Sequence, residues 1–183
     1  MGWRSIRAAG LGALLALLCC GGLDTFVVTE KASAVIPGAS LFEQLAGDFG
    51  FGDFLDMDLS QNQELKNQGV EKGQLDSVRL ISLALTVVEP ASGQDFGFLE
   101  ELRFYVETEG LPRLLIASGG PFPAGASRVE LNLADVDMEP YATAPAMKVT
   151  TEATGRRPRQ QTTIEAELQL EVDVDVSGVA CGG

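Results

Sequence analysis

A long alternation of apolar and polar residues near the C-terminus is the clearest pattern in the chain. From Ile164 to Val176 every second residue is apolar, and the residues between are mostly acidic. A period of two is that of a β-strand with one buried and one solvated face. This segment therefore predicts a long strand. The Thr- and Val-rich stretch 147–154 predicts another, and the turn residues 155–159 between them suggest a hairpin.

Further segments have the composition or the alternation of strands. They are 26–36, 78–88, 102–108, 114–117 and 129–133. The stretch 78–88 is apolar or small on both faces, which predicts a position at the centre of a sheet. The turn at 109–112 joins the predicted strands 102–108 and 114–117. The segment 129–133 predicts a shorter, half-buried strand.

Helix is expected only in short pieces near the N-terminus. The segments Ser40–Glu43 and Ser60–Gln63 each fit a capping box, and the second helix would end at Gly69. About seven short strands separated by turns predict an antiparallel two-sheet β-sandwich, Ig-like or related. A closed β-barrel is the alternative, because the sequence does not determine the strand order.

The first 20 residues follow a different pattern. Arg4 and Arg7 precede an apolar run over 8–18, which is typical of a signal peptide and shorter than the roughly 20 residues of a membrane span. The run ends in Leu17-Leu18-Cys19-Cys20, which resembles the lipobox of bacterial lipoproteins. We therefore expect a signal peptide over 1–19 and lipid attachment at Cys20.

The predicted domain organisation follows from this cut site. Residues 20–24 would be the lipid attachment point and a short linker, and 25–180 a single β-sandwich domain. Ala32-Ser33-Ala34 has the form of an ordinary cleavage site, yet a cut there would remove most of the first predicted strand. A possible disulfide between Cys181 and Cys19 or Cys20 is a second alternative, since exported proteins meet oxidising conditions.

Charge and composition exclude several classes of function. The chain has 13 basic and 26 acidic residues, a net charge of −13, and two of the basic residues lie in the predicted signal peptide. A domain this acidic repels phosphate backbones, so we expect no nucleic-acid partner. It contains no histidine, which excludes Ser-His-Asp and Cys-His catalysis. We expect no enzyme and no cofactor.

The segment 47–58 mixes acidic, glycine and phenylalanine residues. Its carboxylates, which are candidate contacts for a cation or a partner, are Asp48, Asp53, Asp56 and Asp58. Calcium prefers such oxygen ligands, but the spacing of an EF-hand loop is absent. The favoured interpretation is a loop whose phenylalanines close one end of the sandwich. Besides calcium binding, the other alternative is an exposed aromatic patch that contacts a partner.

Two acidic clusters and one basic cluster remain. The acids at 135–139 and 173–175 alternate with apolar residues, which places them on a solvated face rather than in a glycosidase pair. The basic cluster consists of Arg156, Arg157 and Arg159. Solvation in a hairpin turn is its simplest interpretation, and contact with the phosphates of lipid headgroups or lipopolysaccharide is the functional alternative.

The segments Glu64–Val70, Asp76–Leu80 and Gly110–Pro112 resemble those of uncharacterised predicted lipoproteins of myxobacterial type. The resemblance implies a cell-envelope location and a strand-rich body, with no assigned activity. The leading hypothesis is a lipid-anchored cell-envelope protein with a non-enzymatic binding or structural role. The alternative is a periplasmic domain that binds a lipid or acyl chain, suggested by phenylalanines at 49–54 and 96–98.

The expected partners are the membrane, through a palmitate-type anchor, and another envelope protein or lipid. Gly21 follows the proposed lipidated cysteine where an aspartate would resemble an inner-membrane retention signal. The outer membrane is therefore preferred, and a secreted or periplasmic protein is the alternative.

Overall fold

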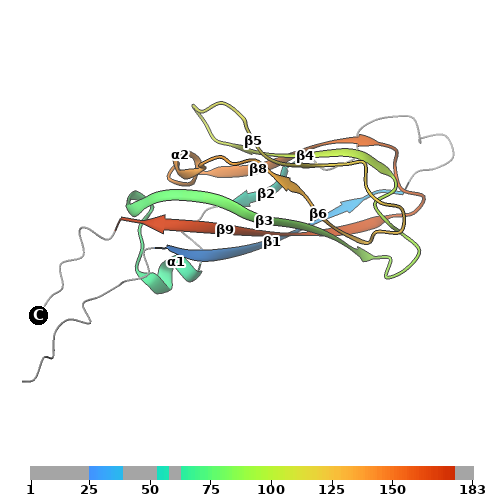
Figure 1. The fold of residues 1–183 in the computed structure, drawn as a ribbon, viewed down its shortest axis with the longest axis horizontal. Helices are drawn as coiled ribbons and strands as arrows, with labels where there is room; N and C mark the ends of the chain where they lie inside the picture. The colour runs from blue at the N-terminus through green and yellow to red at the C-terminus, as the bar shows by residue number, and fades with distance from the viewer. Residues whose placement is uncertain (1–24, 39–52, 58–62, 176–183) are drawn as a thin grey trace, which may run out of the picture.

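Two antiparallel sheets face one another in the computed structural model, which describes residues 25–38, 53–57 and 63–175, with only the backbone at 53–57 (Figure 1). One sheet has the strand order β1-β9-β3-β6 and the other β2-β8-β4-β5-β7. Among the described residues no strand pair joins the two sheets, so the predicted β-sandwich is confirmed and the alternative of a closed barrel is wrong.

The strands are β1 (Thr25–Ile36), β2 (Asp53–Met57), β3 (Leu75–Glu89), β4 (Leu99–Glu107), β5 (Leu114–Gly119), β6 (Arg128–Glu130), β7 (Asn132–Leu133), β8 (Met147–Gly155) and β9 (Thr162–Val174). The helices are α1 (Gln63–Gln68), the 3-10 turn η2 (Lys72–Gln74) and α2 (Glu139–Ala142). Helix α1 ends at Gly69 as predicted, because that glycine takes a φ of 67°. The proposed helix at 40–43 and the capping residue Ser60 lie outside the described residues.

Strand β9 organises the first sheet. Its inward residues are buried along its whole length, as the alternation predicts, and it pairs with β1 from Thr25↔Asp173 to Ile36↔Thr162. On the solvated face Lys31 of β1 lies 3.3 Å from Glu165 and 2.9 Å from Glu167. Hydrogen bonds to these carboxylates raise the pKa of Lys31, and the bond from Lys31 lowers the pKa of Glu167. The cross-strand charges thus support the pairing.

The predicted hairpin between β8 and β9 is wrong. Strand β8 pairs with β2 and β4, whereas β9 pairs with β1 and β3 in the other sheet. Residues 156–161 therefore cross between the sheets. A strand with one apolar face satisfies that face equally well in either sheet, so closeness in the sequence did not decide the partner.

Two other strand predictions also change. The segment 129–133 divides at Leu131 into β6 in the first sheet and β7 in the second, and the Leu131 amide donates to Leu83 O at 3.0 Å. A strand that passes from one sheet to the other in this way forms a corner of the sandwich. Strand β2 lies within the segment that we interpreted as a loop, and with it the described residues hold nine strands rather than about seven.

Strand β3 lies between β9 and β6, in agreement with its predicted central position. Its second face is nevertheless partly solvated, since Ile81 is 41% and Val88 39% exposed. Strands β4 and β5 form the expected antiparallel pair. Between the sheets, the inward side chains form one continuous apolar cluster in which Phe96, Phe104 and Ile164 are fully buried. This cluster is the main source of stability.

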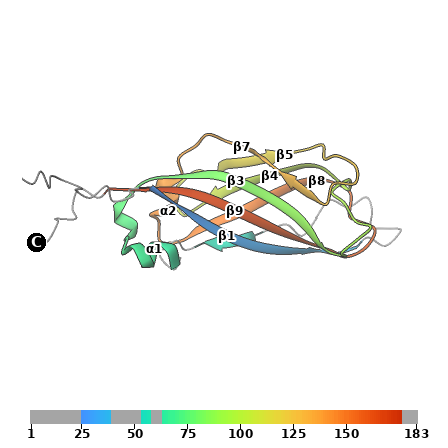
Figure 2. The ribbon, with the colours of Figure 1, turned by 60° about the horizontal axis from the view of Figure 1, so that its bottom comes forward.

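The two ends of the sandwich differ (Figures 1 and 2). At one end, the terminal end, lie the start of β1, the end of β9 and the helices α1 and α2. At the other, the loop end, the β3–β4, β5–β6 and β8–β9 connections gather. Among the described residues no helix is long and apolar enough to cross a bilayer.

Candidate functional site

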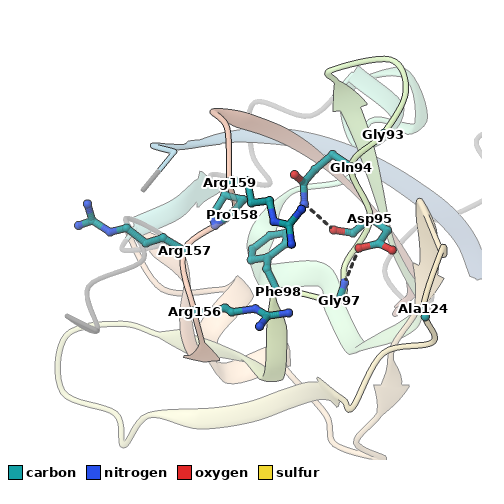
Figure 3. A pocket seen from close by; sticks show the side chains of 10 residues that line it. All are labelled: Gly93, Gln94, Asp95, Gly97, Phe98, Ala124, Arg156, Arg157, Pro158 and Arg159. Atoms are coloured by element: carbon teal, nitrogen blue, oxygen red, sulfur yellow. Dashed lines mark hydrogen bonds between the residues drawn. The ribbon is translucent and has the colours of Figure 1, made fainter. Parts of the chain in front are cut away.

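A pocket of about 490 Å³ opens among the three connections at the loop end (Figure 3). We call it the arginine pocket. It is lined by Gly93, Gln94, Asp95, Gly97, Phe98, Ala124, Arg156, Arg157, Pro158 and Arg159. The volume falls within the range of small-molecule sites, about 300–1,000 Å³. The pocket thus combines a suitable size with a concentration of cationic side chains.

The backbone that carries the arginines is held tightly. Gly155, at the end of β8, has a φ of 140°, and a Cβ there would lie 2.4 Å from Phe98 O. The Arg156 amide donates to the same carbonyl oxygen at 2.8 Å. Pro158 is buried and its ring restricts the backbone further. The arginine segment is therefore anchored to the end of the β3–β4 connection.

Asp95 joins two of the three connections that form the pocket. Its Oδ1 accepts a hydrogen bond from the Gly97 amide at 3.0 Å and its Oδ2 accepts one from the Gly125 amide at 2.7 Å. The first is an Asx turn within the β3–β4 connection, and the second reaches the β5–β6 connection. The bonds from Gly125 and Gly97 lower the pKa of the Asp95 carboxyl. Backbone donors therefore satisfy both oxygens of this carboxylate.

We predict that Asp95→Asn lowers the free energy of unfolding at pH 7 by about 1 kcal/mol, because an amide can accept at one oxygen only. The folded pKa of Asp95 lies below its ordinary value of 3.8, so the wild-type advantage is present above that value and is lost as the pH falls through the folded pKa. Urea unfolding of both proteins from about pH 7 to pH 2 measures this. A difference that does not shrink in acid would contradict the assigned role.

Several other cations of the described residues lie against carboxylates. Arg79 is 2.8 Å from Asp135, and Arg103 is 2.8 Å from Glu101. Arg113 is the most elaborate case: it pairs with Glu107 at 2.6 Å and with Glu152, and it lies 3.7 Å above the ring of Tyr105. Its hydrogen bond, followed by that of Tyr105, lowers the pKa of Glu152.

The arginine pocket breaks this pattern. Within the described part of the chain, the guanidinium groups of Arg156 and Arg159 form no ion pair, and both side chains are exposed. Arg157 differs from these two residues, because it makes a polar, ring or electrostatic contact. In a chain with twice as many acidic as basic residues, two pocket arginines that form no ion pair raise the local positive potential. The arrangement is suited to binding an anion.

Several residues singled out from the sequence lie outside the described residues. They are Cys20, Cys181, Asp48 and Asp58. Asp53 and Asp56 belong to β2, whose backbone pairs with β8. The calcium and lipid-attachment hypotheses stay predictions. In the described ranges no group of three or more acidic or cysteine residues is placed to hold a metal ion.

The two acidic clusters have structural contacts. Asp137 Oδ1 accepts hydrogen bonds from the Val78 amide at 3.0 Å and the Glu139 amide at 2.9 Å, which joins β3 to the start of α2. In the second cluster Asp173 Oδ1 accepts from the Thr25 hydroxyl at 3.3 Å. These contacts agree with the structural interpretation of both clusters.

Sequence reasoning found the arginines but missed the wall that faces them. The wall includes Gln94, Asp95 and Gly97. An aspartate followed two residues later by a glycine, as in Asp95 and Gly97, predicts an Asx turn. Nothing in the sequence places that turn opposite Arg156, because the two segments are brought together only by the pairing of β4 with β8, which sets Leu99 opposite Gly155.

Comparison with known proteins adds little. No protein-family model and no curated protein matches the chain. A solved structure of Desmodium yellow mottle tymovirus aligns over 100% of both chains at 16% identity, with a TM-score of 0.21. A TM-score this low carries no argument about fold or function.

Proposed function

We propose that this chain is a lipid-anchored cell-envelope protein with a non-enzymatic binding role, in which the sandwich holds the arginine pocket away from the membrane. The observation that carries the proposal is the separation of the two ends. Thr25 pairs with Asp173 at the terminal end, while the connections that line the pocket lie at the loop end (Figure 1).

The distance between the ends can be approximated from strand length. Strand β1 has 12 residues, and a strand rises about 3.3 Å per residue, so it spans about 40 Å. Only Gly21 to Asp24 separate Cys20 from β1, and a stretch of this length reaches at most about 17 Å. A lipid on Cys20 would therefore attach the terminal end and leave the pocket facing outward.

Charge supports the same orientation. The many acidic side chains on the outer face of the first sheet, such as Glu165 and Glu171 of β9, repel an anionic bilayer. A domain that stands away from the surface reduces this repulsion. The arginine pocket is then unsuited to the headgroups of the membrane that holds the anchor, and it is available to ligands beyond it. We place the protein at the outer membrane on the strength of Gly21.

We predict that Cys20→Ser abolishes labelling with palmitate. The physical reason is that the proposed lipid anchor is attached through the sulfur of Cys20, which serine lacks. The measurement is fractionation of cells grown with labelled palmitate. Cys181→Ser is the matched control and should remain labelled and membrane-bound.

Intact mass spectrometry of the wild-type protein separates the alternatives. The pairing of Thr25 with Asp173 sends the segments toward Cys20 and Cys181 out of the same end of the sandwich, so a disulfide also fits this geometry. If the mature protein carried no acyl chains and its mass were lower than that of the reduced chain by two hydrogens, the disulfide would replace the lipid anchor in this proposal.

The alternative of an acyl-chain-binding domain is less well supported. Of the phenylalanines that suggested it, Phe96 and Phe98 are 0% and 5% exposed and belong to the apolar cluster between the sheets, whereas the side chains at 49–54 lie outside the described part of the chain. An acyl chain would have to displace side chains that already fill that cluster, which costs several kcal/mol. The anionic-ligand role requires no such rearrangement.

A further inference from the structure

The arginine pocket holds two guanidinium groups whose charges no carboxylate of the described residues neutralises. Asp95, the acidic residue of the pocket lining, uses both of its oxygens on the amides of Gly97 and Gly125. It therefore acts as a tie between connections rather than as a counter-ion for Arg156 or Arg159.

The backbone at the start of the arginine segment is held before a ligand arrives. The Arg156 amide is bonded to Phe98 O, Gly155 packs against the same carbonyl oxygen, and Pro158 is buried between the two exposed arginines. A segment held in this way loses little backbone entropy on binding. Figure 3 shows Arg159 on the side of Gln94 and Arg156 on the other side of Phe98, so the two side chains flank the opening.

The number of charges indicates the ligand chemistry. A carboxylate carries one negative charge and is satisfied by one guanidinium fork, whereas a phosphate monoester carries about −1.5 to −2 at pH 7 and has three acceptor oxygens. Two arginines without carboxylate partners match the second group better. The pocket is also larger than a phosphate group alone requires.

Gln94 supplies the second recognition element. Its amide nitrogen donates to Asp95 O at 3.0 Å, which orients the side chain and leaves the amide oxygen as an acceptor at the pocket wall. A ligand hydroxyl is the complementary donor. The phosphate and the hydroxyl would lie on the same small molecule, within the volume of the pocket.

We infer that the arginine pocket binds a soluble phosphorylated sugar, with Arg156 and Arg159 on the phosphate and Gln94 on a sugar hydroxyl. This inference deepens the proposed binding role and rests on it. The same phosphate chemistry also occurs on a lipid headgroup, and the outward orientation of the pocket favours the soluble source.

Isothermal titration calorimetry of the full-length protein in detergent tests the inference with glucose 1-phosphate as the probe. We expect one site with a dissociation constant below about 1 mM. Arg156→Gln and Arg159→Gln should each weaken binding about 10-fold or more, since each removes charge-assisted hydrogen bonds. Arg79→Gln makes the same charge change at the terminal end and should leave binding within about twofold.

Parallel titrations identify the recognised groups. Glucose should not bind, and inorganic phosphate and glucuronate should bind more weakly than glucose 1-phosphate. Equal affinity for glucuronate would overturn the phosphate assignment, and unchanged affinity in both pocket variants would overturn the site. Binding to phosphatidic acid vesicles without binding of glucose 1-phosphate would overturn the soluble source. The palmitate experiment is independent, so loss of the anchor and loss of the pocket assignment are distinguishable.

Discussion

Phe96→Ala is expected to lower the free energy of unfolding by about 3–5 kcal/mol, which is the usual cost of removing a buried aromatic ring from a core. Phe96 is fully buried in the β3–β4 connection and its ring lies 5.7 Å from that of Phe122, in the β5–β6 connection. The Phe96 amide also donates to Ala126 O at 3.0 Å. The ring thus packs between the two connections and joins them.

Urea unfolding followed by circular dichroism measures this loss. Phe96→Leu is the matched control, because it keeps an apolar side chain of smaller volume and should cost clearly less than alanine. Leu115→Ala, at a site that is 37% exposed, should cost less than about 1 kcal/mol. If Phe96→Ala were as mild as Leu115→Ala, the position assigned to the ring would be wrong.

Gly155→Ala is expected to have the second largest effect, a loss of about 2–4 kcal/mol. The new Cβ would lie 2.4 Å from Phe98 O and 2.9 Å from the Cα of Leu99, which are backbone atoms that cannot rotate away. Because Phe98 O also accepts the hydrogen bond from the Arg156 amide, relief of the clash would move the arginine segment. Binding at the arginine pocket should weaken together with stability.

Gly110→Ala provides the control for this substitution. Gly110 also has a positive φ, of 83°, but a Cβ there meets nothing within 4 Å. Its cost is confined to the backbone conformation, about 1–2 kcal/mol, and it should leave the pocket unchanged. Thermal and urea unfolding of both variants compare the two costs. Equal losses would show that the contact with Phe98 O adds nothing.

The faces of the strands were predictable and their partners were not. In β9 the alternation of Ile164, Leu168 and Val172 with acidic residues identifies the buried face, since a strand turns successive side chains to opposite sides. The hairpin of β8 with β9, predicted from their adjacency in the sequence, is wrong. Hydrophobic burial is non-directional, so an apolar strand face is stabilised by packing in either sheet. Leu131 shows the same limit, since one continuous apolar pattern divides between two sheets.

The candidate site was predictable only in part. The cluster Arg156, Arg157 and Arg159 stands out in an acidic chain and suggested anion contact from composition alone. The residues that surround the cluster were not predictable, because Asp95 and Gln94 are distant from it in the sequence and resemble ordinary turn residues. The structure also removes the hairpin-turn interpretation of the arginines, which lie instead on the crossover between the sheets.

The sequence by itself determined the β class of this protein, the buried face of its long strands and the excess of negative charge, because each of these depends on local periodicity or on composition. Only the tertiary structure decided which strands are neighbours and that three distant connections enclose the arginine pocket. Those outcomes depend on which of several apolar faces pack together, and the free energy of that choice is summed over contacts between residues far apart in the chain.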